Sequence, residues 1–200
     1  MNWVTLMNDS RRTRLKRSSL AIAVCLSTIV GGTAAPSQAS STAPACSTRN
    51  LSLGFGSRLS PQTGEHGVMY TLTNRGKSSC LLRGYPGISL YDSKNHLLPF
   101  KYTWAATQYV THAAPIVVRL RPGSRAYFLV AKYRCDVGDA MVAATIRVYP
   151  PNSKEQLIGR ASSSSGVSTF SYCKGGPKDP GQVVGVSPVE ASELALFPTA

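Results

Sequence analysis

Cysteine thiols carry the most defined chemistry in this chain, because a thiolate can bind zinc, attack a substrate or form a disulfide. Cys25 lies inside an apolar N-terminal stretch, and the other four cysteines are spread over the rest of the 200 residues. A zinc site would need close pairs such as Cys-x-x-Cys, and no two of these four lie that close. We therefore predict two disulfides and no metal site. The residues predicted to form them are Cys46, Cys80, Cys135 and Cys173.

Locality favours a pairing of consecutive cysteines, Cys46 to Cys80 and Cys135 to Cys173. Cys46 precedes the first predicted strand and Cys80 starts a neighbouring one, so their bridge would tie the N-terminal segment to a sheet. Other pairings stay open, because spacing alone does not decide connectivity. Loops of this size would each stabilise the fold by about 3–4 kcal/mol in the chain-entropy model.

Acid–base catalysis would need histidines or carboxylates that converge in a pocket. The three histidines sit beside predicted turns or loops, and none has a partner at metal-ligand spacing. Two aspartates lie close together in a predicted loop, without the apolar setting that raises the pKa of a glycosidase acid. We expect all of these side chains to be solvated. They are His66, His96, His112, Asp136 and Asp139.

Ser171 and Lys174 match the Ser-x-x-Lys spacing of penicillin-recognising serine enzymes, in which the lysine activates a serine one helical turn away. Here Cys173 and the following Gly175-Gly176 indicate the end of a strand and a turn instead. The companion motifs of those enzymes are missing, as are phosphate-loop, dinucleotide and Gly-x-Ser-x-Gly motifs. We predict that the protein is not an enzyme and needs no cofactor.

Positive charge is the second chemical feature, since 22 Lys+Arg against 9 Asp+Glu give a net charge of +13. Without the first 39 residues the balance is 17 against 8, or +9, so the excess belongs to the rest of the chain. Arg119, Arg121 and Arg125 flank a predicted turn at 122–123 and are candidates for contact with an anionic polymer. Charges scattered singly over a solvated surface are the alternative. Neither pattern predicts a specific nucleic-acid site.

The N-terminus predicts export. A basic stretch at 11–17 precedes an apolar run at 20–30, which is too short for a permanent membrane helix of about 20 residues. Small residues then favour cleavage after Ala39, with a site after Ala35 as competitor. The basic stretch matches the twin-arginine motif except at Arg14, where an aromatic residue is expected, so both that route and Sec stay open. We expect a secreted or envelope-associated protein with no transmembrane segment in the mature chain and no lipid anchor.

Short segments of alternating apolar residues must position these side chains. Ile116, Val118 and Leu120 should face the core, and the turn at 122–123 should join them to the next strand as a hairpin. Apolar residues recur with the same period from Val142 to Val148. About seven to nine such strands, with no convincing amphipathic helix, favour one antiparallel β-sandwich. Strands are predicted at 66–74, 79–92 with a corner at 84–87, 96–102, 116–121, 125–133, 142–149, 156–159, 168–172 and 182–186, with loops at 103–114 and 162–166.

The length of the chain suits a single domain behind a cleaved leader. Residues 1–39 are the expected signal peptide, and the Ser/Thr/Ala/Pro-rich stretch at 40–45 is an expected disordered spacer. Residues 46–188 should form the disulfide-stapled domain, and residues 189–200 a flexible tail.

Two segments carry a resemblance to a known family. The runs TLTNRGKSSCLLRGYPG at 71–87 and VRLRPGSRA at 118–126, together with the layout of the four cysteines, resemble an exported actinobacterial family known as domain of unknown function 4232. The resemblance covers roughly residues 45–188. Asn95 departs from it, because a turn glycine is more usual there. The family implies an immunoglobulin-like sandwich and no assigned activity.

These patterns favour a non-enzymatic exported binding module that contacts an anionic envelope polymer or another exported protein. The aromatic residues near the Gly-Tyr-Pro corner are a candidate contact face, although packing in strands would also explain them. A small secreted hydrolase acting on cell-envelope material is the alternative, and it requires His96 or His112 beside a carboxylate in an apolar pocket. A purely structural domain is a third reading. The aromatic residues are Tyr85, Tyr91, Tyr102, Trp104 and Tyr109.

Overall fold

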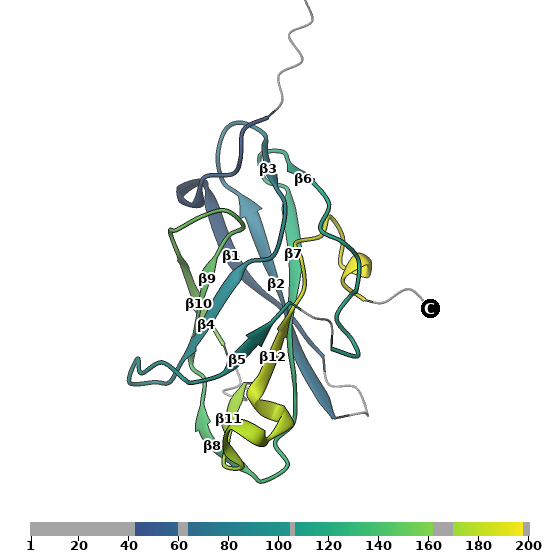
Figure 1. Ribbon diagram of the computed structural model, residues 1–200. Coiled ribbons are helices and arrows are strands. Elements are labelled where there is room, and N and C mark those ends of the chain that lie inside the picture. The colour runs from purple at the N-terminus through teal and green to yellow at the C-terminus, as the bar shows by residue number, and fades with distance from the viewer. Residues whose placement is uncertain (1–42, 60–63, 105–106, 162–169, 198–200) are drawn as a thin grey trace, which may run out of the picture. The chain divides into compact units, whose positions relative to one another are not determined.

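The computed structural model describes residues 43–59, 64–104, 107–161 and 170–197 (Figure 1). This part of the chain holds twelve strands and four short 3-10 helices, so the all-β prediction is confirmed and the strand count exceeds the expected one. No helix among the described residues is long and apolar enough to cross a membrane. The predicted signal peptide and the loop at 162–166 lie outside the described residues, as does the first half of the predicted spacer, residues 40–42.

The largest sheet has five strands in the order β1-β2-β7-β12-β5. Its neighbours pair antiparallel except β12 and β5, which run parallel. The ladder between β2 and β7 extends from Glu65 opposite Tyr133 to Thr73 opposite Arg125. The bounds are β1 Leu51–Leu59, β2 Glu65–Asn74, β7 Arg125–Tyr133, β12 Val183–Val186 and β5 Lys101–Thr103.

The remaining strands form smaller antiparallel sheets: a three-stranded one in the order β10-β9-β4, and the pairs β11-β8 and β3-β6. In Figure 1 the three-stranded sheet lies beside the β1–β2 end of the large sheet. The bounds are β3 Cys80–Leu82, β4 Gly87–Tyr91, β6 Val118–Leu120, β8 Asp139–Val142, β9 Thr145–Tyr149, β10 Leu157–Arg160 and β11 Ser171–Cys173.

The main core lies between the five-stranded and three-stranded sheets, which pack as a sandwich-like fold. Tyr70 of β2 is fully buried and stacks on Phe128 of β7, with 5.4 Å between ring centroids. Its hydroxyl donates a hydrogen bond of 3.1 Å to the carbonyl of Arg160, so β2 reaches β10 across the core. The opposing sheet contributes Leu90 and Ile146 to the same cluster. The predicted alternation of β2 is therefore confirmed on this face.

The opposite face of β2 and β7 is covered as well. Met69 and Leu129 pack there with Val110 and Leu196 in a second apolar cluster. Leu196 lies in the 3-10 helix η4, Leu194–Leu196, and is fully buried. The prediction of a flexible tail from residue 189 is therefore wrong up to residue 197, because apolar residues of this segment bury themselves on the sheet.

Strand β1 is absent from the sequence-based prediction. Gly54 and Gly56 weaken the strand signal of this segment, since glycine disfavours strands. In the structure β1 pairs with β2 from Leu51 opposite Asn74 to Leu59 opposite Gly67. Tertiary pairing therefore overrides the weak local propensity.

The predicted hairpin across 122–123 is wrong. Strand β6 pairs with β3, whereas β7 pairs with β2 and β12, so the turn carries the chain from one sheet to another. Ile116 precedes β6 and is 52% exposed, because the β3–β6 ladder ends at Val118. Val142 is 50% exposed on the two-stranded pair β8–β11, and Ala143 is buried in its place.

Both disulfides join the cysteines that locality pairs. Cys46 and Cys80 have Cα atoms 4.8 Å apart, and the bridge fixes the N-terminal segment beside β3, where the amide of Cys46 also bonds the carbonyl of Leu81. Cys135 and Cys173 have Cα atoms 5.3 Å apart and join the end of β7 to β11. The two crosslinks therefore hold different parts of the domain.

Candidate functional site: a basic hollow beside two turns

A polar hollow of about 430 Å³ lies over β1 and β2. Side chains of β1 and β2, the residue after β2, the start of β7 and the C-terminal segment meet in its wall. The wall contains two guanidinium groups and four hydroxyl groups but a single carboxylate, so it carries a net positive charge. The polar side chains of this basic hollow are Ser52, Ser57, Thr71, Thr73, Arg75, Arg125 and Glu193.

Glycines in β1 keep the floor of the basic hollow open. A Cβ atom added at Gly54 would overlap the Oγ1 of Thr71, and one added at Gly56 would lie 2.7 Å from the carbonyl oxygen of Met69. Side chains at these positions would therefore collide with β2 as well as fill the hollow. The close approach of β2 therefore explains why β1 contains the glycines that weaken its strand signal in the sequence.

Buried Asn74 positions the two turns that carry the arginines. Its Nδ2 donates hydrogen bonds to the carbonyls of Ser78, at 2.9 Å, and Leu120, at 3.1 Å. Its backbone accepts from the amide of Gly123 and donates to the carbonyl of Ser124. The side chain is 1% exposed, so these bonds are shielded from water. The turn after β2 and the turn before β7 are therefore held to one another at this residue.

Arg75 follows Asn74 directly and is fixed at the rim of the basic hollow. Its amide donates to the carbonyl of Asn50, and its Nε donates to the Oγ of Ser52 at 2.9 Å. Arg125 stands opposite Thr73 in the β2–β7 ladder and is exposed. No ion pair joins either guanidinium to Glu193 within the part of the chain that the structure describes. Both arginines are thus placed for an anion from solution.

The three arginines singled out by the sequence are only partly brought together. All three are exposed, with Arg119 on β6, Arg121 in the turn and Arg125 at the start of β7. Of these, only Arg125 lines the basic hollow, where Arg75 joins it. Arg75 is not among the arginines predicted from the sequence, although it lies in the Asn-Arg-Gly turn that the family resemblance includes.

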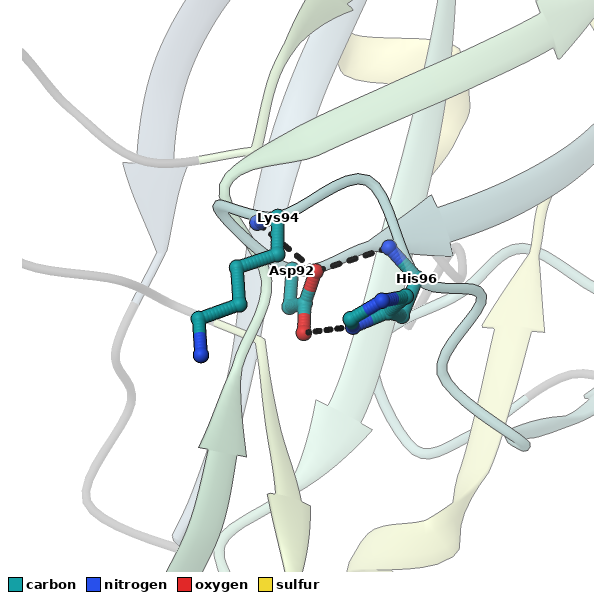
Figure 2. Close-up of polar contacts among 3 residues, drawn as sticks. All are labelled: Asp92, Lys94 and His96. Atoms are coloured by element: carbon teal, nitrogen blue, oxygen red, sulfur yellow. Dashed lines mark hydrogen bonds and ion pairs between the residues drawn. The ribbon is translucent and has the colours of Figure 1, made fainter.

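His96 contacts a carboxylate, but in a surface turn (Figure 2). Its Nδ1 lies 3.2 Å from the Oδ2 of Asp92, whose Oδ1 accepts the amides of His96 and Lys94. These hydrogen bonds, first that of the His96 amide, lower the pKa of Asp92. A hydrolytic acid needs a raised pKa, so this pair is a turn-stabilising device. Asn95 completes the turn at φ 64° and accepts a hydrogen bond of 2.8 Å from Arg147.

The other two histidines occupy different settings. His66 lies in β2 and is half-buried. Desolvation is the main cause that lowers its pKa, and the positive charge of Lys132 is the next. His112 is exposed and lines a separate hollow together with Glu190. The three histidines therefore do not gather in one site, and no cluster of metal-ligating side chains occurs among the described residues.

The remaining candidates for chemistry serve structure. Asp136 and Asp139 are exposed, as expected, and the amide of Asp136 donates to the buried carboxylate of Asp179 at 3.1 Å. Ser171 lies in β11 and Lys174 follows that strand, so they are not one helical turn apart. The Ser-x-x-Lys spacing is therefore coincidental.

The aromatic residues differ in how much of each side chain solvent can reach. Tyr85 stacks on Trp104 with 5.4 Å between centroids, and Trp104 is 61% exposed. Trp104 and Tyr102 also line a shallow hollow at the Gly-Tyr-Pro corner. Tyr91 makes a cation–π contact with Arg147, whose Cζ lies 4.0 Å from the ring centroid. Tyr109 is half-buried and does not line this corner hollow. Only part of the predicted aromatic face is thus available for contact.

Comparison with known proteins gives a family and nothing more specific. A family model described as "Domain of unknown function (DUF4232)" matches residues 46–190. No curated protein and no solved structure matches the chain. The match spans all four cysteines, Asn74, both turns of the basic hollow and Arg125.

Proposed function

Given that the chain belongs to the family described as domain of unknown function 4232, we propose that it is an exported, non-enzymatic module that binds an anionic polymer of the cell envelope. The basic hollow carries this proposal. It combines two arginines, four hydroxyl groups and a glycine-lined floor, and buried Asn74 holds together the two turns beside the arginines. Arginine forks and hydroxyl groups are donors suited to phosphate or carboxylate oxygens. The net charge of the chain would draw such a polymer to the surface.

The binding should depend on salt through a small number of arginines. Replacing Arg119, Arg121 and Arg125 together by glutamine should reduce the slope of log affinity against log salt by about 1, because only Arg125 of the three lines the basic hollow and each neutralised phosphate contributes about 0.9 on duplex DNA. The Arg75→Gln/Arg125→Gln pair should reduce it by about 2 and weaken binding more per residue. Titration with fluorescent poly(glycerol phosphate) over a range of salt concentrations measures both quantities.

The matched control is the pair Arg119→Gln/Arg121→Gln, which removes the same charge outside the basic hollow. Equal effects of the two pairs would place the contact on the whole basic surface. An unchanged slope in the triple variant and in the hollow pair would contradict the proposal and favour another exported protein as partner. Thermal unfolding of each variant checks that the fold survives, as expected from the exposure of these side chains.

A hydrolase acting on envelope material is supported by one observation. His112 and Glu190 line the same partly apolar hollow, and desolvation raises the pKa of Glu190. No hydrogen bond connects the two side chains among the described residues, so a general acid and base acting together is the weaker reading. Release of soluble fragments from purified envelope by the parent protein, lost in Glu190→Gln, would establish it.

Export completes the proposal and gives a separate prediction. Two disulfides suit an oxidising compartment. Cleavage after Ala39 should leave Ser40 as the first residue of the exported form, with a free amine and no lipid. Intact mass of the protein recovered from the medium or envelope measures this. A lipid-modified Cys25 as the first residue would contradict it.

A further inference from the structure

A second hollow, of about 410 Å³, lies over the C-terminal segment and the residues before β6. Its wall is mainly apolar, with Ala113 and Ile116 on one side and Ala195 and Phe197 on the other. Glu190 and His112 are its titratable residues, and neither lysine nor arginine lines it. We call it the Glu190 hollow. It differs from the basic hollow in both polarity and sign of charge.

The backbone of Glu190 is tied to strand β7. Its amide donates a hydrogen bond of 2.8 Å to the carbonyl of Tyr127, and its carbonyl accepts from the amide of Tyr127 at 2.9 Å. This antiparallel bridge places the residue at the base of the hollow, where it is 3% exposed. The position of the carboxylate is thus set by the sheet.

The buried carboxylate of Glu190 has neither a hydrogen-bond donor nor a positive charge paired with it among the described residues. Its Oε1 is buried and has no hydrogen-bond partner among the described residues. An unpaired carboxylate in an apolar setting is strongly disfavoured, and this desolvation raises the pKa of Glu190. Glu65 also has one buried carboxylate oxygen without a partner, but its other oxygen accepts a hydrogen bond from the hydroxyl of Thr107, and the Glu190 carboxylate has no such bond among the described residues. The missing partner therefore points to a ligand that brings a donor.

We propose that the Glu190 hollow binds a small organic amine whose ammonium group pairs with the Glu190 carboxylate and whose apolar body lies against Ile116 and Phe197. An ammonium group donates hydrogen bonds and also compensates the negative charge of the carboxylate. An alcohol can donate a hydrogen bond but carries no compensating charge. An anion would meet the carboxylate with no compensating cationic side chain in the wall. The exposed Ile116, at 52%, offers an apolar surface that such a body would cover.

The proposal is tested with hexylamine, and with hexanol and hexanoate as neutral and anionic analogues of the same length. Calorimetric titration at pH 7.5 uses the exported form of the protein and measures each affinity. Changes in amide chemical shift then locate the binding site. We expect hexylamine to bind at least tenfold more tightly than either analogue and to shift the resonances of Ala113, Ile116 and Glu190. Similar affinities for amine and alcohol, or shifts located elsewhere, would overturn the proposal.

Glu190→Gln keeps the size of the side chain and removes the charge, so it should lower hexylamine affinity at least tenfold and leave hexanol affinity unchanged. Glu155→Gln, at an exposed position outside both hollows, is the matched control and should change neither. Glu190→Asp serves if the glutamine variant does not fold, and it should weaken amine binding by withdrawing the carboxylate. Full amine binding by either folded Glu190 variant would contradict the assignment.

The two proposed sites can fail separately. The Arg75→Gln/Arg125→Gln pair should lose polymer binding and keep hexylamine binding, because neither arginine lines the Glu190 hollow. Glu190→Gln should show the reverse. Recovery of hexylamine chemically unchanged after incubation distinguishes binding from turnover.

Discussion

Removing the Cys135–Cys173 bridge by the double variant Cys135→Ala/Cys173→Ala should lower the free energy of unfolding by about 4 kcal/mol. The bridge spans 38 residues, and the chain-entropy model assigns about that value to a loop of this length. The effect arises mainly in the unfolded chain, which gains conformations when the crosslink is absent. Because small domains have only about 5–15 kcal/mol in total, the variant should be close to its stability limit at 37 °C. Urea unfolding of parent and variant measures the loss.

The second bridge is the matched control for the first. Cys46–Cys80 spans 34 residues, so Cys46→Ala/Cys80→Ala should cost nearly the same if the entropic explanation holds. A much larger loss for the Cys135–Cys173 pair would show that local packing dominates, since Cys173 is 1% exposed and its Sγ lies against Gly181. A loss below about 1 kcal/mol in both would contradict the prediction. Peptide mapping of the unreduced protein checks the pairing itself.

Replacing Lys132 by methionine should stabilise the protein by about 3 kcal/mol at pH 7. Lys132 is 2% exposed in the middle of the large sheet, between His66 and Val184 of the neighbouring strands. Desolvation lowers its pKa to about 8, despite the attraction of Asp139 and Asp179. A shift from 10.5 to about 8 corresponds to about 3 kcal/mol of unfavourable burial of the ammonium form. Methionine fills similar space without a charge.

The pH dependence identifies this cause. Between pH 8 and 10.5 the unfolded chain keeps the proton on Lys132 while the folded protein has lost it, so the stability of the parent should rise with pH. The advantage of Lys132→Met should therefore shrink to under about 2 kcal/mol by pH 9.5. Lys101→Met, at an exposed position of β5, is the control and should change stability little at either pH. A destabilised Lys132→Met variant would show that the ammonium makes net favourable contacts.

Local patterns were sufficient where a strand alternates and has a polar turn at its end. The alternation of β2, with Tyr70 and Leu72 directed to the core, follows from its period of two and survives in the fold. The consecutive pairing of cysteines also follows from locality. Strand β1 could not be predicted from local patterns, because its glycines are required only by the close approach of β2.

Contacts between residues distant in sequence determined strand pairings and burial that local patterns could not predict. The turn at 122–123 looks like a hairpin turn, yet β6 pairs with β3, and the Asn74 side chain bonds the carbonyl of Leu120 at the end of β6. Ile116 consequently became part of an exposed wall. The C-terminal segment has few charges and little periodicity, so only its packing on β7 showed that Leu196 is buried and that Glu190 sits in a hollow.

The sequence by itself determined the charge balance, the spacing of the cysteines and the class of the fold. Charge excess, four well-separated cysteines and period-two segments are properties of the chain, and they predict a basic, disulfide-stapled β domain without reference to any contact. Tertiary structure alone decided which charges act together. Arg75 and Arg125 line one hollow, and Glu190 has no hydrogen-bond donor among the described residues, because desolvation and pairing depend on neighbours that lie far apart along the chain.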